Sequence, residues 1–292
     1  MPIRRTAFVA VAAAAALAIL RGWLAPAAPD PLTSPLIEAR AVIVSAGPGV
    51  ERSASGGGWA AARAGDALGP ADEIRTGPGA TAELSLGRGT TLVVDERSEL
   101  TVREIDAVAQ KVRLVRGRIG VDHRRDGIRV VRVEDVSGTI LASSAEGRWS
   151  AVAAHDTFAV AAAAGAVRLE SAGAAVDVAP GTVSTAWRGV APLAPRPVST
   201  AVLLRVAHAL AERRKEACAT LEVDVASEVE VNGEPAPVSR DGRVLVRVPA
   251  RLRRHPVDVV VRHVAGKIER RQVRCVEEEP QVRALEVRWD AR

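Results

Sequence analysis

The sequence predicts an all-β protein with two domains, joined by a linker and preceded by an apolar N-terminal segment. Short stretches in which apolar and polar residues alternate recur along the chain between glycine-containing turns, a pattern typical of proteins built from β-hairpins. Only 2% of the 292 residues are aromatic and none is Tyr, so Val, Leu, Ile and Ala must fill the cores, which suits thin sheets. A proline-rich stretch at residues 191–197 divides the chain into two parts, each long enough for a small core.

The net charge argues against a dedicated nucleic-acid groove. Lys and Arg number 40 against 35 Asp and Glu, which gives a formal charge of +5. The basic residues are spread through the expected strands, and no aromatic side chains stand beside them on which bases could stack. We therefore expect no nucleic-acid partner.

The first 28 residues have the pattern of an export signal. Two arginines precede an apolar run at residues 6–20, and an A-x-A sequence ends at Ala27, which is typical of a secretory signal peptide cut near that residue. An uncleaved apolar helix that anchors the chain in a membrane through residues 6–24 is the alternative. Either way we expect export, to the periplasm or to the inner membrane facing the periplasm, with residues 29–40 as an extended linker.

The first domain is expected over residues 41–190. In the stretch 80–86, Ala82, Leu84 and Leu86 alternate with polar residues, which places them on one buried side of a strand. The same reasoning makes Leu92 and Leu114 core residues. Further strands are expected at 41–45, 91–94, 111–115, 118–122, 127–133, 138–142, 149–153, 157–162, 166–169 and 175–178, with Gly117, Gly165 and Gly181 at recurring corners, so that a sandwich or a stack of short rungs results.

Several features at fixed spacing then coincide in one window. Trp59 is followed by G-D-x-L at Gly65, by D-E-I-R-T-G at residues 72–77, and by A-E-L-x-L-x-x-G-T-x-L at residues 82–92. This order resembles the FecR domain, an extracytoplasmic all-β module associated with iron-transport signalling. The residues that carry the resemblance are Trp59, Gly65, Asp66, Asp72, Ile74, Arg75, Thr76, Gly77, Leu84, Leu86, Gly89, Leu92 and Gly117.

The resemblance has two departures. Where the family usually has G-T-x-F, this chain has Gly147, Arg148 and Trp149, which puts a family-type binding or packing role of that turn in doubt. Family members that regulate sigma factors carry a cytoplasmic domain before their membrane helix. Only a few residues precede the apolar run here, so we expect no such effector domain.

Residues 191–217 are expected to form a proline-rich linker and one helix. The helix is predicted over residues 198–217, because Val202, Val206 and Leu210 recur at helical spacing and Ser199 or Thr200 can cap its start. We interpret it as a connector that packs on the following domain.

The C-terminal part, residues 218–292, returns to strand patterns. Strands are expected at 221–225, 229–231, 243–248, 257–261 and 267–275, and Asn232-Gly233 and Asp241-Gly242 are hairpin signals. This order of strands and turns resembles the small Ig-like β-sandwiches of bacterial surface proteins.

Both cysteines, Cys218 and Cys275, fall in this C-terminal part. In an exported protein the first expectation is a disulfide between them, with two buried thiols or an intermolecular bridge as alternatives. No His stands at zinc-ligand spacing from either Cys, so a zinc site is not expected.

The sequence contains no constellation typical of catalysis, and we expect neither an enzyme nor a cofactor. The five histidines are scattered, and we interpret His123, beside Arg124 and Arg125, as part of a solvated turn. Asp66, Asp72 and Glu73 lie near Arg75 in the sequence. Turn caps and surface ion pairs explain this cluster more simply than a cation site.

These patterns favour an exported, non-enzymatic protein that binds or scaffolds an envelope protein or a cell-wall component. The alternative is a sensory relay of the iron-transport type without a cytoplasmic anti-sigma domain. An envelope hydrolase is a third and weaker hypothesis. The expected organisation is a signal peptide or anchor (1–28), a linker (29–40), a FecR-like domain (41–190), a linker with a helix (191–217) and an Ig-like module (218–292).

Overall fold

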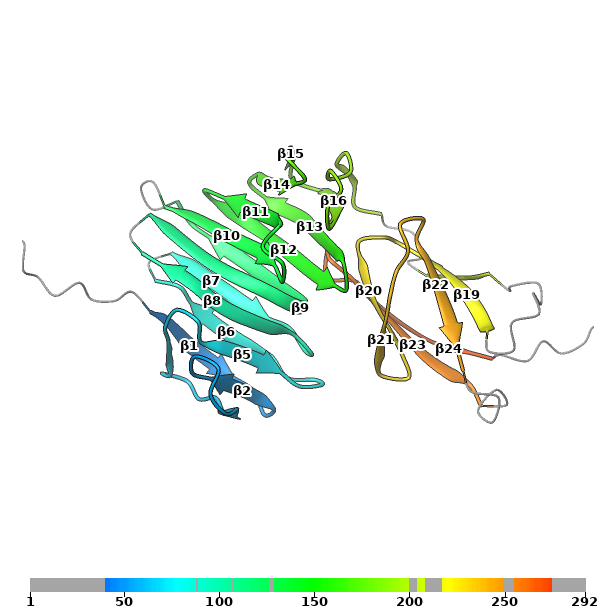
Figure 1. Ribbon diagram of the computed structural model, residues 1–292, viewed down its shortest axis with the longest axis horizontal. Helices are drawn as coiled ribbons and strands as arrows, with labels where there is room; N and C mark the ends of the chain where they lie inside the picture. The colour runs from blue at the N-terminus through cyan, green and yellow to red at the C-terminus, as the bar shows by residue number, and fades with distance from the viewer. Residues whose placement is uncertain are drawn as a thin grey trace, which may run out of the picture. The chain divides into compact units, whose positions relative to one another are not determined.

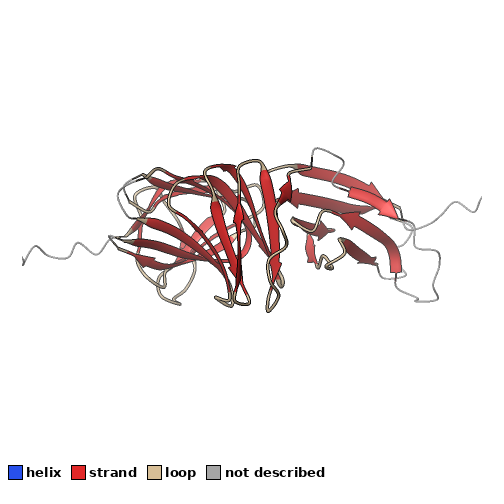
Figure 2. Ribbon diagram, turned by 90° about the horizontal axis from the view of Figure 1, so that it is seen from above, coloured by secondary structure: helices blue, strands red, loops and turns tan. Residues whose placement is uncertain are grey.

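Every regular element in the described part of the chain is a β-strand (Figure 2). The computed structural model describes residues 40–87, 89–106, 108–125, 129–199, 204–207, 217–248 and 255–274. The expected apolar N-terminal helix falls outside these residues. Among the residues described, no helix is long and apolar enough to cross a membrane.

The first sandwich consists of two sheets that share one long strand, β9 (Ala109–His123) (Figure 1). Its C-terminal half pairs in sheet I and its N-terminal half in sheet II. Sheet I has the order β4 (Ala67–Leu68), β1 (Ala41–Ala46), β6 (Ala82–Ser85), β7 (Thr90–Val94), β9, β12 (Gly147–Ala154), β13 (Thr157–Ala164), β16 (Thr182–Trp187) and β17 (Arg196–Pro197). Sheet II has the order β3 (Ala60–Ala61), β2 (Val50–Ser53), β5 (Glu73–Thr76), β8 (Glu99–Ile105), β9, β10 (Val130–Asp135), β11 (Ile140–Ser144), β14 (Val167–Ser171) and β15 (Ala174–Val178).

The order of strands in both sheets broadly follows the chain. Successive strands or hairpins fall alternately in sheet II and sheet I, so the polypeptide winds along the sandwich and adds to both layers as it goes. The fold is therefore a two-layer sandwich built from stacked rungs, and both descriptions expected from the sequence apply. Strands β9 and β10 run parallel, whereas the other pairs in these two sheets, as far as the structure describes them, are antiparallel.

The core confirms the strand phase read from the sequence. Leu84, Leu86, Leu92 and Leu114 are all fully buried in one cluster that unites both sheets. Phe158 is the largest fully buried side chain among the described residues. Aliphatic side chains fill most of the remaining core, as the low aromatic content requires.

Gly117 is the point at which β9 leaves sheet II and enters sheet I. Its φ is +86°, in the left-handed region, and a Cβ at this position would lie 2.6 Å from the Cα of Ser98. The Ser98 hydroxyl accepts a hydrogen bond from the Arg118 N–H at 2.9 Å and donates one to the Arg118 carbonyl at 3.0 Å. The expected corner at Gly117 is thus a bend within one continuous strand rather than a break between two.

The C-terminal part forms a second sandwich with its own apolar core, which consists mostly of valines. The Asn232-Gly233 hairpin is confirmed, because both residues have positive φ (52° and 83°) between two paired strands. One sheet has the order β18 (Leu204–Ala207), β19 (Ala217–Val223) and β22 (Arg243–Arg247), and the other β21 (Glu234–Ala236), β20 (Ser227–Val231), β23 (Val257–His263) and β24 (Ile268–Val273).

The Asp241-Gly242 signal does not mark a hairpin. The strands that flank it, β21 and β22, belong to different sheets, so the segment between them crosses from one layer to the other. Asp241-Gly242 sits at the end of this crossover, where Gly242 donates a backbone hydrogen bond to Ser239 at 2.9 Å.

The predicted helix over residues 198–217 is wrong where the structure describes it. Leu204–Ala207 is strand β18, which pairs antiparallel with β19. The alternation of Leu204, Arg205 and Val206 also fits a strand. The strand is favoured because β19 supplies backbone hydrogen-bond partners, and the local sequence does not show that β19 lies beside it. Residues 200–203 and 208–216 lie outside the described part of the chain.

The apolar phase of β6 leads to a test of stability. Leu84→Ala removes a fully buried side chain and should lower the free energy of unfolding by roughly 2–5 kcal/mol. The matched control is Val42→Ala on the neighbouring strand β1, where the side chain is 39% exposed and the loss should stay within about 0.5 kcal/mol. Urea denaturation at 25 °C measures both, and equal losses would contradict the assigned strand phase.

The expected disulfide remains a prediction, because Cys275 lies outside the described residues. Cys218 packs, half-buried, against the core of the second sandwich. A bridge to Cys275 would close a loop of about 57 residues and contribute on the order of 4 kcal/mol. Reduction should then lower the melting temperature of the second sandwich and leave the first, which has no Cys, unchanged. Two free thiols in the mass of the unreduced protein would reject the bridge.

Candidate functional site

The residues that carry the family resemblance serve mainly the fold. Ile74 is fully buried, like the three leucines of the motif, and Thr76 is buried with its hydroxyl accepting a hydrogen bond from the Ser98 N–H at 2.9 Å. Gly65 and Gly89 occupy turns with φ of 90° and 73°. Gly77 donates its N–H to the carbonyl of Gly49 at 2.9 Å. Most of the motif is thus a set of core and turn positions.

The polar members of the motif are held by local hydrogen bonds. Asp66 accepts from the backbone N–H of Arg63 at 2.9 Å and from the Arg52 guanidinium at 2.8 Å, and these bonds lower the pKa of its carboxyl. Asp72 accepts from the N–H groups of Gly69 at 2.8 Å and Ser55 at 3.0 Å. The two carboxylates therefore act as turn caps, as interpreted from the sequence. The described residues contain no group of three or more His, Cys, Asp or Glu placed to hold a metal ion.

Arg75 does not join this acidic cluster. Its Nε donates to Glu51 Oε2 at 2.7 Å, and its guanidinium carbon lies 4.1 Å from the ring centroid of Trp59. This cation–π contact ties Trp59, which directly precedes β3, to the neighbouring strands of sheet II.

The interpretation of His123 as part of a solvated turn is wrong. His123 is the last residue of β9 and is buried, with its Nδ1 2.8 Å from the Thr90 hydroxyl. It continues the inward phase of Ile119 and Val121, which the sequence already contained. The two arginines that follow it in the sequence favoured the interpretation as a solvent-exposed turn.

The main concentration of buried charge in the described structure lies where the second sandwich meets the β7–β8 turn, a feature that sequence reasoning missed. On β20 and β23, Val229 and Val261 point into the core of the second sandwich. Glu228, Glu230 and Arg262 alternate with such residues and point away from that core. They are nevertheless only 6%, 3% and 5% exposed. The first sandwich covers them.

The charges form a chain of ion pairs across the contact, which we call the ionic cluster: Arg97, Glu230, Arg262 and Glu96. Arg262 Nη2 donates to Glu96 Oε1 at 3.0 Å, and its Nη1 lies 2.7 Å from Glu230 Oε1 as an ion pair without hydrogen-bond alignment. Arg97 reaches the other oxygen of Glu230 at 3.4 Å and donates to the Gly233 carbonyl at 2.8 Å.

Local contacts favour the ionised forms of Glu96 and Arg262. Burial on its own would raise the pKa of Glu96, but the Gly79 N–H and Arg262 outweigh it and lower that pKa. Burial would likewise lower the pKa of Arg262, and the carboxylates of Glu230 and Glu96 raise it instead. Glu96 and Arg262 thus favour each other's ionised form across the contact, in addition to Gly79 and Glu230 of their own sandwiches.

A second set of contacts lies beside the cluster. The carbonyl of Val264, in the β23–β24 turn, accepts from Arg118 Nε at 2.9 Å and from the Ser150 hydroxyl at 2.6 Å. Around these bonds an apolar patch forms from Val152, Ala159, Ala161 and Val183 of the first sandwich and Ala226 and Val264 of the second. The contact therefore combines a buried apolar patch with buried charge.

Asp224 adds a further contact between the second sandwich and β17 of sheet I. It pairs with the guanidinium of Arg196 on β17 and accepts from the Ala226 N–H at 2.8 Å. Burial opposes ionisation, but His263, Arg196 and the Ala226 N–H hold the pKa of Asp224 well below its usual range.

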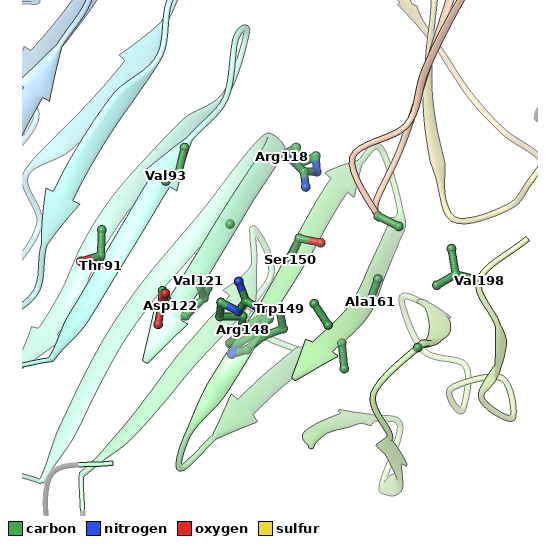
Figure 3. A pocket seen from close by; sticks show the side chains of 15 residues that line it. Thr91, Val93, Arg118, Val121, Asp122, Arg148, Trp149, Ser150, Ala161 and Val198 are labelled. Carbon is green, nitrogen blue, oxygen red and sulfur yellow. The ribbon is translucent and has the colours of Figure 1, made fainter. Parts of the chain in front are cut away.

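A groove of about 480 Å³ opens on the outer face of sheet I next to this contact (Figure 3). Small residues, Gly120, Ser150 and Ala161, line part of it. Asp122 and Arg148 are cross-strand neighbours of β9 and β12 and both line the groove. The turn at Gly147, Arg148 and Trp149 is the one that departs from the family pattern. There Trp149 is buried in the core of the first sandwich, and Arg148 is exposed.

A comparison with known protein families matches part of the first sandwich. Residues 72–183 match the family model described as FecR protein. The match begins at Asp72 of the motif, covers the strands from β5 to the start of β16, and leaves the second sandwich outside. No curated protein matches the sequence.

Solved structures with some similarity include two crystal structures, at 2.50 Å and 1.65 Å, of a candidate anti-sigma factor from Parabacteroides distasonis ATCC 8503. They are 16% and 15% identical to this chain, each with a TM-score of 0.38 over 43% of it. The chain spans 59% of the length of those proteins.

The ionic cluster leads to a test by substitution. Arg262→Met removes the central cation and leaves Glu230 buried with one partner fewer, so the free energy of unfolding should fall by about 3–5 kcal/mol. Arg270→Met is the matched control, because that side chain is 66% exposed and lies 3.9 Å from the same Glu96. Its loss should be below about 1 kcal/mol. Losses of equal size in urea denaturation would show that the cluster does not stabilise the protein.

Proposed function

We propose that this chain is a non-enzymatic FecR-type module that acts outside the cytoplasm by binding a protein partner in a regulatory pathway. The observation that carries the proposal is the FecR match over residues 72–183, which covers most of the first sandwich. The resemblance implies regulation at the cell envelope. We therefore prefer the sensory relay, which the sequence patterns offered as the alternative, over simple binding or scaffolding.

The arrangement of side chains supports binding rather than catalysis. The candidate acids of the motif, Asp66 and Asp72, are occupied as turn caps, and Arg75 is occupied by Glu51 and Trp59. A hydrolase would need such carboxylates and cations free to contact a substrate, whereas here the motif's own acids and Arg75 bind turns and neighbouring strands.

The second sandwich supports scaffolding as a second candidate function. Its two-sheet architecture and valine core fit our interpretation of it as an Ig-like module. A relay and a scaffold place different demands on it. A relay needs the two sandwiches to respond to a partner, whereas a scaffold needs only that they stay attached.

Deletion of the gene in the native host, followed by transcript profiling, tests the relay. Loss of the protein should change a confined set of genes, and the complete chain should restore their expression. The matched control is the same chain without residues 1–28, which stays in the cytoplasm and should not restore it. An envelope defect without any confined transcriptional change would favour the scaffold. Restoration by the cytoplasmic form would contradict action outside the cytoplasm.

A further inference from the structure

Glu228 differs from the other buried charges of the contact because it has no partner. It is 6% exposed, and no described residue forms a hydrogen bond or ion pair with its carboxyl. It faces a cavity of about 360 Å³ between the β20–β21 hairpin and the motif turn that contains Thr76, Gly77 and Pro78. A buried carboxylate without compensation is costly, so this position favours the neutral acid.

The cations around Glu228 are already engaged. Arg262 on β23 serves Glu230 and Glu96, Arg97 of the β7–β8 turn serves Glu230, and Arg116 on β9 serves Glu99 at 3.2 Å. The other charged groups that line the cavity are Glu51 and Arg75, which pair with each other, together with Glu230 on the same strand and Glu234 on β21.

The balance at Glu228 raises its pKa to about 7. Burial is the largest cause, Arg262 opposes it, and the neighbouring Glu230 adds to it. On β20 the side chain points away from the core of its own sandwich. Separation of the two sandwiches would therefore return it to water and to an ordinary value near 4.5.

We propose that the contact between the two sandwiches is proton-dependent, with Glu228 as the sensing group. At weakly acidic pH, Glu228 is protonated when the sandwiches are docked and ionised when the contact opens. The ionic cluster and the apolar patch around Val264 hold the two sandwiches together. The protonation of Glu228 makes the equilibrium constant for their docking depend on pH.

The direction follows from the two protonation states. The docked state holds the proton up to about pH 7, and the open state releases it near pH 4.5. The contribution of Glu228 to docking is therefore fully present below pH 4.5 and is lost as pH rises through 7. Between pH 5 and pH 7 the docking constant should fall about 40-fold. The lowered pKa values of Glu96 and Asp224 place their own titration below this window.

Thiol accessibility measures the opening. Ala161→Cys places a thiol in the apolar patch under the second sandwich, and Ala163→Cys places one on the same face of β13 in an exposed position. Reaction with a disulfide reagent that remains active at low pH gives a rate for each. The ratio of the buried rate to the exposed rate cancels the ionisation of the thiol and reports the open fraction.

The ratio should rise about 40-fold from pH 5 to pH 7 in the otherwise unchanged exported protein. Glu228→Gln should remove this dependence, because the neutral amide mimics the protonated acid at every pH. Glu234→Gln, in the same cavity but exposed, should keep it. A ratio that stays constant with pH, or a dependence that survives Glu228→Gln, would overturn the proposal.

A direct titration covers the case in which the thiol variants fail to fold. Carbon-13 NMR of the glutamate carboxyls, assigned with Glu228→Gln, should find a pKa near 7 for Glu228. The same signal in an Ala161→Arg variant, whose bulky side chain wedges the patch apart, should titrate near 4.5. An ordinary value in the unchanged protein would refute the proposal, and so would a value near 7 in the wedged variant.

Discussion

The first sandwich depends on the passage of β9 from one sheet to the other at Gly117. Only a residue without a Cβ can make this bend against Ser98, and the Ser98 hydroxyl bonds both backbone groups of Arg118 just beyond it. Because β9 pairs with two strands in each sheet, its bend sets the register of both layers at once. The buried side chains on either side of the bend, Leu114 before it and Ile119 and Val121 after it, then belong to one core.

The same turn that serves this bend also serves the second sandwich. Ser98 ends the β7–β8 turn, and Glu96 and Arg97 in that turn bind Arg262 and Glu230. Burying these ions costs solvation, which their mutual attraction offsets, and burial of the apolar patch around Val264 adds to the stability of the contact. The rigid core of the first sandwich thereby holds the polar side of the contact in position.

Local patterns predicted the local parts of this structure. Alternation identified the core positions of β6, β7 and β9, and Asn232-Gly233 identified a hairpin whose geometry needs two positive φ angles. Two-residue strands such as β3 and β4 carry too few residues to show a period. The strand at Leu204–Ala207 exists because β19 offers it hydrogen bonds, and no window around residues 198–217 contains that information.

The charged contact escaped prediction for a related reason. Glu96 and Arg262 are 166 positions apart, and each reads as an ordinary surface residue in its own segment. On β20, Glu228 and Glu230 alternate with Val229 and point away from the valine core, as solvent-facing residues of a strand would. That outward side is buried because the first sandwich covers it, and one sequence does not show which surfaces are in contact.

The very short strands at the ends of the first sandwich have a consequence for its behaviour among other proteins. In the part of the sandwich that the structure describes, β3, β4 and β17 close three sheet edges with two residues each. Such edges expose too few unpaired backbone groups to recruit a strand from another molecule. The fourth edge, β15, has five residues, and Asp177 on its exposed side places a charge there. In the described part of the first sandwich, strand length at three edges and charge at the fourth thus disfavour pairing with a strand of another molecule.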